Sequence, residues 1–309
     1  MSREWTTDEL IASWMLVDGD WPLVGNKSGV TRLGFALLLR FFELEARFPR
    51  GPEEFAWVVV AYVADQVKVA PEEFDGYDWA GRSVKYHREQ IRTEFGFREF
   101  TRGDEDKVAA WLAEEVCPVE LREEQLRQAV LVRCRAERLE PPGRMERIVG
   151  SARASFERRF CEATLSRLDG GCLVALEDLV AEDAPLLPGG RTLWGELKAD
   201  PGQASLETLL REIDKLAAVR ALGLPGGLFA DASEKLVAAW RARAARAYPS
   251  DLRAMPGSVR VTLLAALCRL RATEITDALV DLLITLRRSA PPVNELCPDS
   301  SRARRLVGR

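Results

Sequence analysis

The sequence predicts an all-α, multi-helical protein with two or three small helical subdomains and a disordered C-terminal tail. Apolar residues recur at helical spacing in one segment after another, with proline, glycine and acidic residues where helices begin and end. The chain shows no series of short alternating segments separated by turn signals, which would indicate β-hairpins. A stretch rich in glycine and proline divides the helices into two groups.

This division gives an expected domain order. Residues 1–168 form an N-terminal helical region, 169–204 a linker with turns, and 205–288 a second helical domain. From Ser289 onward the helical period is lost and prolines and scattered arginines follow, so 289–309 is expected to be a disordered tail.

The N-terminal region begins with a strongly apolar helix over 30–46, which Phe48 and Pro49 close. A second helix is expected to start at Pro52, because proline and the two acids after it suit a first helical turn. The β-branched run that follows leaves a strand as the alternative there. Further helices are expected at 82–95, 104–116, 121–139 and 144–168, and in the second half at 205–222, 233–247, 259–272 and 275–288.

The composition fits an ordinary globular protein. Of 309 residues, 47% are hydrophobic and 30% charged, and no apolar run approaches the roughly 18 residues of a membrane span. The polar, acidic N-terminus is unlike a signal peptide, so a cytoplasmic location without membrane contact is expected. The six cysteines have no CxxC spacing, and the single histidine cannot complete a zinc set with them. We therefore expect buried thiols and no metal or cofactor.

The charge changes sign along the chain, although the net charge is −4. Residues 81–102 contain six basic and three acidic side chains, whereas residues 1–80 contain seven basic and fourteen acidic ones. A protein that binds DNA needs a basic face and not a basic total. The segment 81–102 therefore predicts a phosphate-contacting helix, with a solvated face that binds nothing as the alternative.

A helix over 82–95 would place cations at offsets of 3, 6 and 10 on one face and an apolar set on the neighbouring face, with Gly96 as the C-cap. The expected apolar residues are Val84, His87, Ile91 and Phe95. The candidate DNA contacts are Arg82, Lys85, Arg88, Arg92, Arg98 and Arg102.

Two further features have a structural interpretation. His87 is expected to be buried or half-buried and bonded to an acid or a backbone carbonyl, because no nucleophile or metal partner is evident. The acids at 103–106 are expected to cap a helix and not to bind a metal ion.

Several motifs resemble the Tn-three family of replicative transposases. The strings NKSGVTRLGFALLLRFF at 26–42, RSVKYHREQIRTEFGFREF at 82–100 and PPGRMERIVGSA at 141–152 are similar to the N-terminal region of that family. KLVAAWRARAARAYPSDLR and SVRVTLLAALCRLRATEITDALVDLLI resemble the helical region that follows it, so the resemblance extends from Trp5 to Arg287. It implies an all-helical region that recognises transposon terminal inverted repeats in double-stranded DNA. It also implies that part of this region supports self-association.

The resemblance also implies what to expect of catalysis. Family members are several times longer, and their chemistry needs three carboxylates on two metal ions in a distant ribonuclease-H-like domain. Here Asp18 and Asp20 fit a turn, and Asp277 and Asp281 share a helix face without a third partner. The helical pattern breaks after Leu286, as a truncation or frameshift would produce. The expectation is a non-enzymatic DNA-binding transposase fragment that lacks the catalytic domain.

Two other function classes are alternatives to this expectation. An enzyme in its own right is disfavoured, because the glycines at 189–190 and 223–227 fit neither a phosphate-binding loop nor a dinucleotide fingerprint. A helical protein-interaction or dimerisation scaffold without specific DNA recognition is the main alternative. Salt dependence separates the two, because phosphate contacts give a steep slope.

Overall fold

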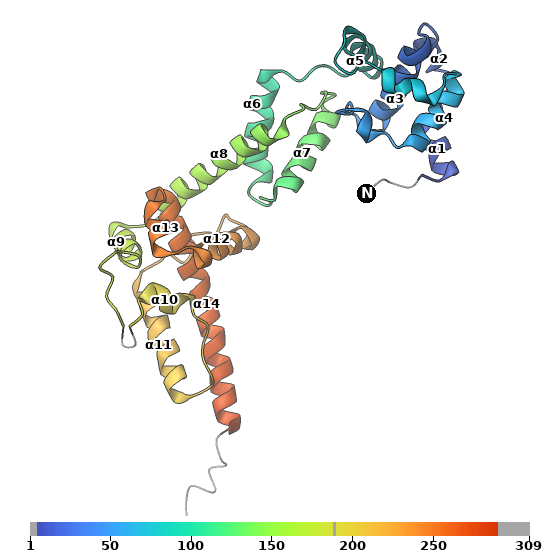
Figure 1. The fold of residues 1–309 in the computed structure, drawn as a ribbon. Coiled ribbons are helices and arrows are strands. Elements are labelled where there is room, and N and C mark those ends of the chain that lie inside the picture. Colours follow the sequence, from blue (N-terminus) through green and yellow to red (C-terminus); the bar gives the residue numbers. More distant parts are fainter. Residues whose placement is uncertain (1–4, 188–189, 290–309) are drawn as a thin grey trace, which may run out of the picture. The chain divides into compact units, whose positions relative to one another are not determined.

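The computed structural model describes residues 5–187 and 190–289 (Figure 1). Regular structure in these ranges is helical and the only β-type pairings are the isolated bridges Arg98–Leu139 and Leu186–Thr192, so the all-α prediction is confirmed. The chain forms two compact units that divide between Ser155 and Phe156, within helix α8 (Met145–Ser166). Of the expected tail at 289–309, Ser289 is the last residue of α14, and the part from Ala290 onward lies outside the described residues.

The first unit contains the helices that precede α8. They are α1 (Thr7–Trp14), α2 (Trp21–Val24), α3 (Gly29–Glu45), α4 (Trp57–Val67), α5 (Arg82–Phe95), α6 (Arg102–Trp111) and α7 (Glu123–Ala136). Two 3₁₀ turns, η1 (Pro52–Glu54) and η2 (Pro71–Gly76), and a π-helical turn, η3 (Leu112–Val116), join them.

Helix α4 starts later than the sequence indicates. The turn at Pro52 is a separate 3₁₀ element, and the chain is extended at Phe55 before α4 begins at Trp57. This break inserts the Phe55 ring into the core, where it meets the rings of Trp14, Phe41 and Phe74 with centroids 5.4–6.1 Å apart. The strand alternative for this segment is wrong.

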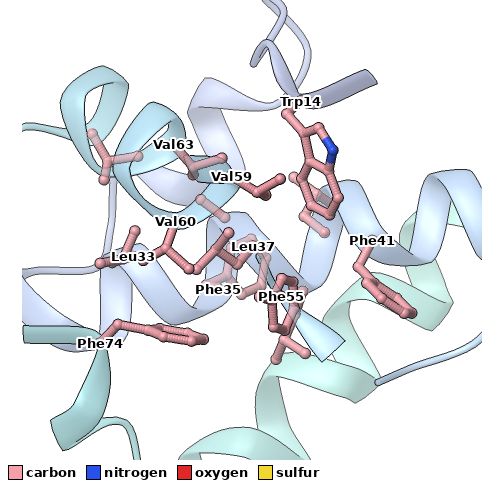
Figure 2. Close-up of a cluster of buried hydrophobic side chains, with 14 of the residues drawn as sticks. Trp14, Leu33, Phe35, Leu37, Phe41, Phe55, Val59, Val60, Val63 and Phe74 are labelled. Atoms are coloured by element: carbon pink, nitrogen blue, oxygen red, sulfur yellow. The ribbon is translucent and has the colours of Figure 1, made fainter. Parts of the chain in front are cut away.

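The core of the first unit is built around α3 (Figure 2). Its residues 33–42 are all buried, because α1, α4, α5 and η2 pack around it. The labelled side chains in Figure 2 come from α1, α3, α4, η2 and Phe55, and they form one continuous apolar cluster. Helix α5 therefore sits on a fixed platform.

Gly34, Tyr77 and His87 form one packed group at the contact between α3 and α5. The ring of Tyr77 lies so close to Gly34 that a Cβ atom there would come within 2.2 Å of it. The Tyr77 hydroxyl is 2.8 Å from Nδ1 of His87, which is 4% exposed. The predicted burial of His87 is confirmed, but its partner is a phenol and not an acid or a carbonyl.

The imidazole of His87 is held in its neutral form. Burial, with a smaller contribution from the charge of Lys27, lowers the pKa of His87 from 6.5 to about 4. The ring of Phe35 meets it edge-on, with centroids 5.1 Å apart. His87 therefore has a structural role, as a neutral side chain packed in the core.

The second unit contains the C-terminal part of α8 and six further helices. They are α9 (Gly170–Asp178), α10 (Leu193–Lys198), α11 (Leu206–Ala221), α12 (Glu234–Arg246), α13 (Pro249–Ala254) and α14 (Gly257–Ser289). Helices α9 and α10 lie in the stretch 169–204, which the sequence suggests is a linker. The two helices expected at 259–272 and 275–288 are one, because no residue between them breaks the backbone hydrogen bonding.

The described cysteines are free and buried, as expected: Cys117, Cys134, Cys161, Cys172 and Cys268. Burial raises the pKa of Cys134 and of Cys268 to about 12, so these thiols are unreactive at neutral pH. None of the described helices is both long and apolar enough to cross a membrane.

Candidate nucleic-acid interface

Helix α5 is positioned by its inner face and by its C-terminal cap. Val84, His87 and Ile91 are buried against the first core. Gly96 adopts the left-handed conformation, with φ of 67°, and the amide of Phe97 donates to the carbonyl of Arg92 at 2.7 Å. The glycine cap and three of the four residues of the expected apolar face are as predicted, whereas the fourth, Phe95, is only half-buried.

The cations at the start of α5 are available to a ligand. Arg82 and Lys85 are exposed. Neither side chain has an ion pair or hydrogen bond in the described part of the chain. Their full charge therefore faces solvent.

Arg88 contacts its own chain. Its Nη2 donates to the carbonyl oxygen of Pro49 at 3.2 Å, and its guanidinium lies 5.1 Å from the centroid of the Phe48 ring. Its Nε is buried without a hydrogen-bond partner. The expected exposure of Arg88 is therefore only partly met.

Arg92 is not available, and its expected exposure is wrong. Its side chain is 13% exposed and pairs with Glu140 at 2.6 Å and with Glu99 at 2.9 Å. The chain reverses after Gly96 and brings Glu99 back. Glu140 lies in the segment that follows α7, and its backbone amide donates to the carbonyl of Arg98 at 2.9 Å. Helical spacing contains no information on acids this distant in sequence.

Arg98 precedes α6 in the chain, and Arg102 is the first residue of that helix. Both terminal nitrogens of Arg98 contact Asp104, at 2.6 and 2.7 Å. Asp104 also forms a capping box with Thr101, so the predicted capping role of this acidic segment is confirmed. Arg98, then Thr101, hold the pKa of Asp104 well below its usual range. Arg102 is exposed and, within the described residues, unpaired.

Comparison with known proteins gives this geometry a context. Residues 1–152 match a family described as a domain of unknown function, DUF4158. The chain is 26% identical over 283 residues to the transposase for transposon Tn21 of Escherichia coli, a match that covers 89% of this chain and 28% of that protein. The chain is a relative of the Tn-three family transposases. The resemblance drawn from the motifs is confirmed.

Two other transposases give similar matches. That for transposon Tn3926 of Escherichia coli is 24% identical over 285 residues, covering 89% of this chain and 28% of that protein. That for transposon Tn1546 of Enterococcus faecium is 27% identical over 204 residues, covering 62% of this chain and 20% of that protein. The chain thus spans less than a third of the length of these relatives.

In this transposase relative, the groove beside α5 is electrically balanced. The cavity of about 580 Å³ lies between α5 and the turn at 141–143. Its charged lining residues are three cations and three acids: Lys85, Arg88, Arg92, Glu89, Glu99 and Glu140. Of the available cations, Lys85 lines this groove, whereas Arg82 and Arg102 do not.

Two further residues of α5, Tyr86 and Gln90, lie outside the predicted basic and apolar sets. Tyr86 is 59% exposed, and the side-chain amide of Gln90 donates to its hydroxyl at 3.1 Å. An exposed tyrosine beside free cations is a signal for nucleic-acid contact. Tyr86 belongs to neither the apolar nor the basic set, so these two patterns do not identify it. No group of three His, Cys, Asp or Glu side chains suited to a metal ion occurs in the described ranges.

Proposed function

We propose that this chain takes part in DNA transposition by binding duplex DNA at transposon terminal inverted repeats. The carrying observation is a set of three cations, Arg82, Lys85 and Arg102, that are exposed and unpaired within the described part of a chain resembling transposases over 89% of its length. Strand cleavage is not part of the proposal.

The number of available cations sets the expected salt dependence. Each neutralised phosphate contributes about −0.9 to the slope of log binding constant against log salt concentration. Three contacts therefore give a slope of roughly −3, whereas all six cations of the sequence prediction would give a steeper slope of roughly −5. The structure supports the smaller value, because Arg92 and Arg98 are paired internally and Arg88 turns inward.

The test is a fluorescence anisotropy titration with the labelled terminal repeat and a scrambled duplex at several salt concentrations. The proposal expects tighter binding to the repeat. Equal affinity for both duplexes would contradict specific recognition. A flat salt dependence would contradict phosphate contact and favour a scaffold.

A second candidate function, self-association, is supported by an apolar surface on the second unit. Helices α11 and α14 pack side by side and run in opposite directions (Figure 1). Six of their aliphatic side chains are 43–67% exposed, and we call them the α11–α14 face: Leu206, Leu210, Ile213, Val280, Leu283 and Ile284.

Two of these side chains, Ile213 and Leu283, lie on the same side of the helix pair. Ile213 follows the buried Glu212, and Leu283 follows the buried Leu282. The side chain after a buried position is rotated by about 100° around the helix axis. Because α11 and α14 run in opposite directions, this rotation brings Ile213 and Leu283 to the same side of the pair. A second copy fits this face, since antiparallel pairing of two α14 helices places Arg287 and Arg288 near Asp277 and Asp281.

Sedimentation velocity over a range of protein concentrations tests this candidate. Ile213→Glu with Leu283→Glu should shift the protein toward monomer. Val174→Glu is the matched control, because Val174 is 62% exposed on α9, away from this face. A wild-type protein that stays monomeric at all concentrations would contradict self-association.

A further inference from the structure

The face of α5 that points outward is not the basic stripe marked by the sequence. Val84, His87 and Ile91 define the buried side of the helix. With about 100° per residue, the positions opposite to them are 82, 86, 89 and 93. We call these residues the outward ridge; all four are exposed: Arg82, Tyr86, Glu89 and Thr93.

We infer that the outward ridge enters the major groove of the bound DNA, where Tyr86 and Glu89 contact base edges and determine sequence preference. This inference rests on the proposed DNA binding. The major groove accepts one α-helix, and the ridge is the part of α5 farthest from the protein core. Arg82, at the N-terminal end of the ridge, and Lys85, beside the ridge, then contact phosphates at the edge of the groove, which positions the helix without selecting sequence.

Tyr86 is prepared for a base contact. The Gln90 amide donates to its hydroxyl oxygen at 3.1 Å, which orients the phenol and leaves its O–H proton free to donate. Acceptors such as N7 of a purine or O4 of thymine line the major groove. Because the side chain is held in place, less conformational entropy is lost on binding.

Glu89 supplies selection against wrong sequences. Its carboxylate has no ion pair among the described residues, although it lies next to cations on the same helix. Near phosphates a carboxylate is repelled unless it accepts a hydrogen bond, and the amino group N4 of cytosine is the donor in the major groove that suits it. Thr93 is less suited, because its hydroxyl donates to the carbonyl of Glu89 at 2.9 Å.

The experiment measures binding of the full chain to the terminal repeat, to its single base-pair substitutions and to a scrambled duplex. Glu89→Gln should lower the ratio of repeat to scrambled affinity by roughly tenfold and relax the preference at one G·C position. Tyr86→Phe should relax a neighbouring position and leave the salt slope unchanged. Glu94→Gln is the control, since it removes the same charge from an exposed site on α5 outside the ridge.

The outcomes distinguish failure of the proposed DNA binding from failure of the base contacts alone. A wild-type chain that binds no duplex specifically overturns both the proposed function and this inference. A wild-type chain that binds the repeat specifically, with Glu89→Gln and Glu94→Gln shifting all duplexes equally and Tyr86→Phe leaving the base preferences unchanged, overturns the inference alone. Circular dichroism of each variant verifies the fold, which these exposed substitutions should leave intact.

Discussion

The two ends of α5 have the same type of side chain in contrasting surroundings. At the start, Arg82 is exposed and unpaired within the described residues. Near the end, Arg92 is 13% exposed and held between Glu99 and Glu140. The difference shows that acids from distant parts of the chain decide whether a cation is free to bind a ligand.

The largest effect is expected at the start of α5. Replacing Arg82 and Lys85 together by alanine should reduce the steepness of the salt slope by about two units and weaken DNA binding by at least roughly tenfold at low salt. Arg92→Ala should leave the slope unchanged. Anisotropy titrations of the three proteins measure this, and an equal slope loss in Arg92→Ala would remove the distinction between the two ends.

Next in size is the loss of stability at the end of α5. Arg92→Gln leaves Glu140 largely buried without its partner and should lower the free energy of unfolding by about 2 kcal/mol. Urea denaturation of Arg92→Gln, Glu140→Gln and the double variant gives the coupling energy. Additive losses would show that the two side chains do not act as a pair.

The inner face of α5 should respond to pH. His87 has a pKa of about 4 in the folded protein and about 6.5 when unfolded, so only the unfolded chain takes up a proton between these values. The stabilisation by neutral His87 should be complete well above pH 6.5. It should fall by about 2 kcal/mol between pH 7 and 5, and the loss should end near pH 4.

The control for this pH effect is His87→Gln, which removes the only histidine of the chain. Its stability should be lower at pH 7 and nearly constant down to pH 5, and its DNA sequence preference should be unchanged. Loss of that preference in a folded His87→Gln protein would place His87 at the DNA surface.

The smallest effect is expected at the start of α6. Asp104→Asn should cost about 1 kcal/mol at pH 7, because the capping box and the contact with the half-exposed Arg98 weaken. The pKa of Asp104 is lowered by folding, so its contribution is present above about pH 4 and lost as the pH falls further. If the wild-type protein and Asp104→Asn still differ in free energy of unfolding well below pH 4, the contribution of Asp104 comes from packing and not from its charge.

Local patterns predicted much of α5. The spacing of Val84, His87 and Ile91 indicated the buried face, and Gly96 indicated the end of the helix. Another local signal was present and missed: Thr6 and Glu9 form a capping box that starts α1. By contrast, helical spacing alone could not predict the break at Phe55, since it depends on rings that meet only in the folded core.

The binding surface was less predictable than the fold. The helical spacing predicted that Arg88 and Arg92 are free to bind DNA. It could not show their contacts with Pro49, Glu99 and Glu140, because these residues lie outside the helix. The sequence shows Tyr86 plainly, but only burial of the opposite face identifies it as outward.

The close contact of Gly34 with the Tyr77 ring has an evolutionary consequence. A side chain at position 34 would occupy the space of that ring, and loss of the ring would leave His87 without its hydrogen-bond partner. Substitution at any one of these three positions therefore changes which residues selection tolerates at the other two. In an alignment of relatives, substitutions at positions 34, 77 and 87 should therefore occur together, although position 34 is distant in sequence from the other two.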